Sequence, residues 1–77
     1  MSENESQKIR VQFEMGKESV ERLDRIRART AASSRADVIR RALGLYQYIL
    51  EEFDAGASIY LEKKEEKYRI VFADLTR

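Results

Sequence analysis

In the sequence KIRVQFEM, residues 8–15, the side chains alternate strictly between polar and apolar. Two faces result, with Ile9, Val11, Phe13 and Met15 on one and Lys8, Arg10, Gln12 and Glu14 on the other. A period of two predicts a β-strand with one buried face. Gly16 follows directly and ends the pattern.

The period changes to that of a helix from Lys17 to about Ala31. A narrow apolar stripe recurs at steps of three and four residues, formed by Val20, Leu23, Ile26 and Thr30. Arg22, Arg25 and Arg29 lie opposite, and glutamates four residues ahead of the first two provide i,i+4 ion pairs. We therefore interpret the arginine stripe as a solvated face and not as a binding surface.

A second helix is predicted from Arg35 to Asp54. Ser34 and Asp37 have the spacing of a capping box ahead of an apolar run, and Gly56 is a suitable stop. The helix has one wide apolar face: Val38, Ile39, Ala42, Leu43, Leu45, Tyr46, Ile49, Leu50 and Phe53. One thin helix and one short strand cannot cover so broad a face, which indicates a partner helix.

The strand at residues 8–15 has no sequential neighbour with which to pair. An unpaired strand leaves its backbone N–H and C=O groups without partners, which is costly where its apolar face is buried. Antiparallel pairing with the same strand of a second chain would satisfy these groups and bring two wide helix faces together. One two-fold axis solves both problems, so a homodimer is predicted.

Residues 57–77 form a separate C-terminal extension. The runs 58–63 and 67–72 are β-prone and flank the charged Lys64–Glu66, which predicts a hairpin in which Ile59 and Leu61 share a face with Tyr68, Ile70 or Phe72. The favoured role is to cap the dimer core, with the aromatic residues as packing residues. The alternative is that its exposed edge joins dimers into a higher oligomer.

Composition excludes several classes of protein. The 77 residues contain no Cys and no His, which removes disulfides, thiol nucleophiles and the commonest general base and metal ligand. No metal site and no enzyme are expected. Residues 1–7 are expected to be a disordered tail; they resemble no signal peptide, and no apolar run could span a membrane, so a cytoplasmic location is expected.

The net charge of +1 hides an uneven distribution. Residues 8–47 carry ten Lys and Arg against five Asp and Glu, while the segments on either side are each acidic by two charges. A basic centre between acidic ends is typical of a surface that binds a polyanion.

The order strand, helix, capped turn and helix in residues 8–53 resembles the ribbon-helix-helix family of bacterial DNA-binding proteins, which includes Arc, MetJ and CopG. The resemblance rests on IRVQFEM at 9–15, VERLD at 20–24 and SRADVIRRA at 34–42. It implies a mainly α fold with short β, a β-α-α dimer to which the C-terminal hairpin, 57–77, is added. It also implies an antiparallel ribbon that enters the major groove.

The resemblance also implies which residues contact DNA. The outward positions of the ribbon, Arg10, Gln12 and Glu14, would read bases. Arginine suits guanine and glutamine suits adenine, whereas Glu14 would have to accept from cytosine or pair with an arginine across the ribbon. Phosphates would be held by Lys8 and by the start of the second helix: Ser33, Ser34 and Arg35.

The turn departs from the family pattern, since Ala31-Ala32-Ser33 stands where relatives often have glycine. A left-handed residue is strained without glycine, so a different turn geometry is expected.

Three functions fit this pattern. The first is a transcriptional regulator or nucleoid-associated protein that binds double-stranded DNA. The second is an antitoxin whose C-terminal segment masks a toxin protein. In the third, no resident cofactor is expected, but a nucleotide second messenger such as cyclic di-GMP binds at Arg10 in competition with DNA.

Overall fold

The computed structural model describes residues 8–75, with helix α2 at Lys17–Thr30, helix α3 at Arg35–Asp54, strand β1 at Ile59–Lys63 and strand β2 at Glu66–Ile70. The tail expected at residues 1–7 and the last two residues of the extension lie outside this range. The predicted helices agree with the observed ones to within one residue. The hairpin strands are shifted by up to two residues from 58–63 and 67–72.

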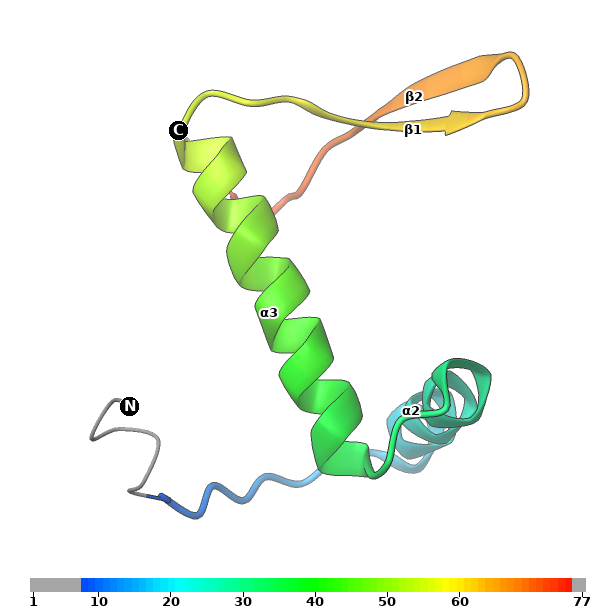
Figure 1. Ribbon diagram of the computed structural model, residues 1–77, viewed down its shortest axis with the longest axis vertical. Coiled ribbons are helices and arrows are strands. Elements are labelled where there is room, and N and C mark those ends of the chain that lie inside the picture. The colour runs from blue at the N-terminus through cyan, green and yellow to red at the C-terminus, as the bar shows by residue number, and fades with distance from the viewer. Residues whose placement is uncertain (1–7, 76–77) are drawn as a thin grey trace.

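Residues 8–16 form neither helix nor strand in the single chain. They lead into α2 as an irregular segment at one end of the molecule, while the hairpin lies at the other end of α3 (Figure 1). A strand needs a hydrogen-bonded neighbour, and none of the described residues supplies one. The ribbon strand therefore stays a prediction about two chains.

The two helices end in the same way, in a left-handed residue followed by a hydrogen bond that spans five residues. Gly56, with φ 94°, ends α3, and the Ala57 N–H donates to the Glu52 carbonyl over 3.0 Å. Ala31, with φ 55° and ψ 34°, ends α2, and the Ala32 N–H donates to the Arg27 carbonyl over 3.1 Å. Both are Schellman motifs. The expectation that the turn avoids the left-handed geometry is wrong, because alanine adopts it.

The core is small and lies where α2 crosses the beginning of α3 (Figure 1). Leu23, Ala32 and Val38 are the buried residues of the described chain, and Ile39 packs against them. The Schellman motif directs Ala32 into this cluster. Beyond Ile39, most of the apolar face of α3 is exposed, as Leu45 at 61% shows.

The hairpin pairs β1 antiparallel with β2 through a two-residue turn, Lys64 and Glu65. Ile59 lies opposite Ile70 and Leu61 opposite Tyr68, so these four residues share one face as predicted. Lys64 has φ 56°, because a tight hairpin turn requires a positive φ at its first central residue or at both.

Candidate nucleic-acid interface

The segment of residues 8–15 presents both of its faces to solvent. Val11 is 77% and Phe13 60% exposed, although both belong to the face predicted to be buried. On the other face Arg10 and Gln12 are neighbours. With the Gln12 amide oxygen turned towards Arg10, that oxygen accepts from the guanidinium Nη2 over 2.9 Å and from Nε over 3.2 Å. Side chains two residues apart thus lie on one side, as in a strand.

The start of α3 is a capped helix N-terminus. Ser34 has an extended backbone, and its hydroxyl oxygen accepts from the Asp37 N–H over 3.0 Å. The first N–H groups of a helix have no acceptor within it, and those of Arg35 and Ala36 find none among residues 8–75. They lie at the positive end of the helix dipole, where an anion is stabilised.

The carboxylate of Asp37 has a different partner from that of a capping box. It accepts from the Ser33 N–H over 3.0 Å, not from Ser34, and pairs with Arg41 over 3.0 Å. The Ser33 N–H lowers the pKa of Asp37, and the charges of Arg41 and Arg40 act in the same direction. The ionised Asp37 carboxylate therefore accepts the hydrogen bond of the Ser33 N–H, the group that the family resemblance assigned to a phosphate.

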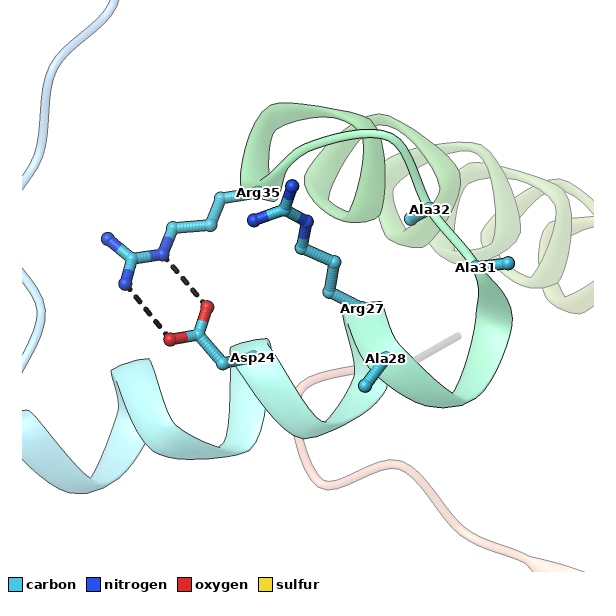
Figure 2. A pocket seen from close by; sticks show the side chains of 6 residues that line it. All are labelled: Asp24, Arg27, Ala28, Ala31, Ala32 and Arg35. Carbon is cyan, nitrogen blue, oxygen red and sulfur yellow. Dashed lines mark hydrogen bonds and ion pairs between the residues drawn. The ribbon is translucent and has the colours of Figure 1, made fainter.

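A shallow pocket lies beside this turn, between α2 and the start of α3. Figure 2 shows Arg35 and Asp24 with their planar groups side by side: the guanidinium donates from Nε and Nη2 to the two carboxylate oxygens, each over 2.9 Å. The hydrogen bond from Arg35 lowers the pKa of Asp24 and in turn raises that of Arg35. Arg27 lines the same pocket, and its guanidinium donates to the Ser33 carbonyl over 3.0 Å.

The family model of the ribbon-helix-helix proteins, copG family, matches residues 9–47, half of the chain. The chain belongs to this family. At this level the CopG-family protein is a DNA-binding protein of the regulator class, a class that is typically dimeric and non-enzymatic. No curated protein and no solved structure matches it significantly.

The predicted contact residues of this CopG-family protein fall into two groups. Lys8, Arg10, Gln12 and Glu14 are exposed on the segment before α2, and Glu14 forms no ion pair with any residue between 8 and 75. Ser33, Ser34 and Arg35 lie together at the turn. Both groups lie towards the same end of the molecule (Figure 1).

Sequence reasoning missed the two side chains that position this turn, Asp24 and Arg27. Asp24 is eleven residues from Arg35 and Arg27 is six residues from Ser33. No periodicity relates residues on different helices, so only the angle between the helices could reveal these pairs. The Arg35 guanidinium is consequently held by Asp24, so the predicted phosphate contact of Arg35 would have to use its backbone N–H.

Within residues 8–75 of the CopG-family protein, no three acidic side chains gather as metal ligands would. None of the described helices is both long and apolar enough to cross a membrane.

Proposed function

We propose that the protein is a homodimeric transcriptional regulator or nucleoid-associated protein that acts on DNA in the bacterial nucleoid. In this proposal residues 8–15 of two chains pair antiparallel and insert as a ribbon into the major groove. Arg10 and Gln12 contact base edges, and Glu14 lies at the end of the reading face.

The single observation that carries this proposal is the exposed segment 8–15, which is unpaired among the described residues and which the match to the CopG family covers from residue 9. Its apolar residues are largely exposed in the single chain, and exposure of this kind is unfavourable unless a partner covers them. A second copy of the same segment has the matching alternation and satisfies the backbone as well.

Helix α3 supports the same dimer. Ile39, Ala42, Tyr46, Ile49 and Phe53 follow one another at alternating steps of three and four residues. This period of 3.5 residues suits packing against another helix. Because α2 covers only the beginning of α3, a second copy of α3 is the natural partner for the rest.

The phosphate contacts follow from the free N–H groups at the start of α3. A phosphate is held by the backbone N–H groups of Ser34, Arg35 and Ala36. The ammonium group of Lys8 makes a further phosphate contact at the end of the ribbon. Asp37 opposes this contact electrostatically but is itself paired with Arg41.

The test is selection of binding sites from a random duplex library, followed by affinity measurement on the selected duplex. Arg10→Ala should weaken binding by a factor of about 5–150, the value of one lost bidentate base contact. Gln12→Ala should weaken it similarly. Arg25→Ala removes one charge from the outer face of α2 and should have a much smaller effect.

All three variants should remain dimers in sedimentation analysis. The ribbon proposal fails if Arg10→Ala binds the selected duplex as Arg25→Ala does. Titrating the DNA complex with cyclic di-GMP tests the nucleotide alternative. That alternative requires the nucleotide to displace DNA from the wild type but not from Arg10→Ala.

No contact among residues 8–75 favours the antitoxin alternative. The hairpin is already paired in the single chain, whereas segments that fold on binding are disordered in the free protein.

A further inference from the structure

The C-terminal hairpin has one apolar face with no cover from the described residues. We call it the apolar hairpin face: Ile59, Leu61, Tyr68 and Ile70. Leu61 is 54%, Tyr68 50% and Ile70 36% exposed, and only Ile59, at the root, is half-buried. Isolated two-stranded hairpins are marginally stable in water, so the face must pack against something.

The opposite face is polar and has a contact of its own, while on the apolar hairpin face the Tyr68 hydroxyl donates to the neighbouring Glu66. Tyr60, Glu62, Lys67 and Arg69 lie there, and the ammonium of Lys67 sits 4.8 Å from the centre of the Tyr60 ring. The hairpin is therefore two-sided, and packing is expected on the apolar hairpin face alone.

The chain's own helices do not supply the cover. The hairpin projects sideways from the end of α3 and does not lie along it (Figure 1). It is also far from the ribbon, since α3 has 20 residues and a helix of that length spans about 30 Å. The CopG match ends at residue 47, so the surface is additional to the family's core.

Charge favours a second copy as the occupant. The turn region, residues 62–67, carries three Lys and three Glu, so two copies meet without net repulsion. The apolar hairpin face ends at the turn in Lys63 and Glu66, one charge of each sign on the same side of the sheet. A two-fold axis sets a surface against itself, which allows Lys63 of each copy to approach Glu66 of the other.

We propose that the apolar hairpin face is a second self-association surface, through which hairpins of two dimers pack face to face. The dimers are thereby joined into assemblies of four chains or more. This inference rests on the proposed function for the dimer itself, but the two interfaces lie at opposite ends of α3 and are separable by mutation.

The experiment is sedimentation velocity on the purified full chain and on two matched variants. Leu61→Glu places a charge on the apolar hairpin face, and Tyr60→Glu places the same charge on the opposite face of the same strand, at nearly equal exposure of 54% and 51%. The wild type and Tyr60→Glu should sediment as four chains or more, and Leu61→Glu as two. Far-UV circular dichroism checks that α2 and α3 remain folded.

If the wild type sediments as an assembly no larger than that of Leu61→Glu, the proposal is overturned, and the apolar hairpin face is left as a surface for another protein. Equal loss of the large assembly in both variants also overturns it, since the effect would not belong to one face. A Leu61→Glu protein that sediments as single chains supports the hairpin contact but contradicts the ribbon dimer. Leu61→Glu should still bind the selected duplex, because its ribbon is unchanged.

Discussion

At the scale of the residue, Ala31 has a strained backbone, since it is an alanine in the left-handed region. It and Gly56 occupy equivalent positions in two Schellman motifs, yet only Gly56 lacks the Cβ that the left-handed region disfavours. An L-residue in that region costs roughly 1–2 kcal/mol. Ala31 nevertheless keeps the left-handed backbone geometry, because the following Ala32 is buried against Leu23 and Val38.

Ala31→Gly should therefore stabilise the protein. Relief of about 1–2 kcal/mol of strain is at least as large as the roughly 0.4–1 kcal/mol that glycine loses through the unfolded chain, which leaves a gain of about 0–1.6 kcal/mol. Chemical denaturation at fixed protein concentration measures this. Ala32→Gly, one residue later and without a positive φ, should destabilise; a destabilised Ala31→Gly would contradict the argument.

At the scale of the element, polar contacts join α2 to α3 beside the apolar contact. Asp24 of α2 binds Arg35 of α3 by two hydrogen bonds, and Arg41 of α3 donates to the Thr30 carbonyl over 3.3 Å at the end of α2. These bonds hold the helix N-terminus that we propose as a phosphate site, so loss of Asp24 should affect both stability and DNA binding.

The Asp24–Arg35 pair predicts a pH dependence. The pKa of Asp24 is lowered from 3.8 by Arg35, so the pair's contribution is fully present above pH 3.8 and is lost as the pH falls through the lower, folded value. The difference in unfolding free energy between wild type and Asp24→Asn should be constant near neutral pH and shrink below about pH 4. Denaturation at a series of pH values measures it.

Arg35→Gln removes the same pair from the other side and is the matched control. Its difference from the wild type should shrink over the same pH range. A difference that stays constant down to the acid limit of folding would contradict the role given to this pair.

At the scale of the whole molecule, the single chain lacks a sufficient core. Three buried residues among those described cannot offset the conformational entropy of a folded domain of this size. The apolar faces of the segment 8–15, of α3 and of the hairpin remain open, and each is suited to a copy of itself. Most of the stability must therefore come from association.

The unfolding midpoint should consequently rise with protein concentration. Folding coupled to association follows mass action, so thermal unfolding followed by circular dichroism should move to higher temperature across a hundredfold range of concentration. Leu61→Glu should keep this dependence because the substitution leaves the proposed ribbon interface unchanged. A midpoint independent of concentration would show that the chain folds alone.

Local periodicity and capping act between near neighbours, so the helices, the Ser34 cap, the Gly56 stop, the shared face of the hairpin and the family are all predictable from the sequence. The left-handed geometry of Ala31, the hydrogen bond from the Ser33 N–H to Asp37 and the pairing of Asp24 with Arg35 appear only in the folded chain. These outcomes depend on the angle at which two helices meet. That angle is set by the packing of Leu23, Ala32 and Val38, which no single stretch of sequence contains.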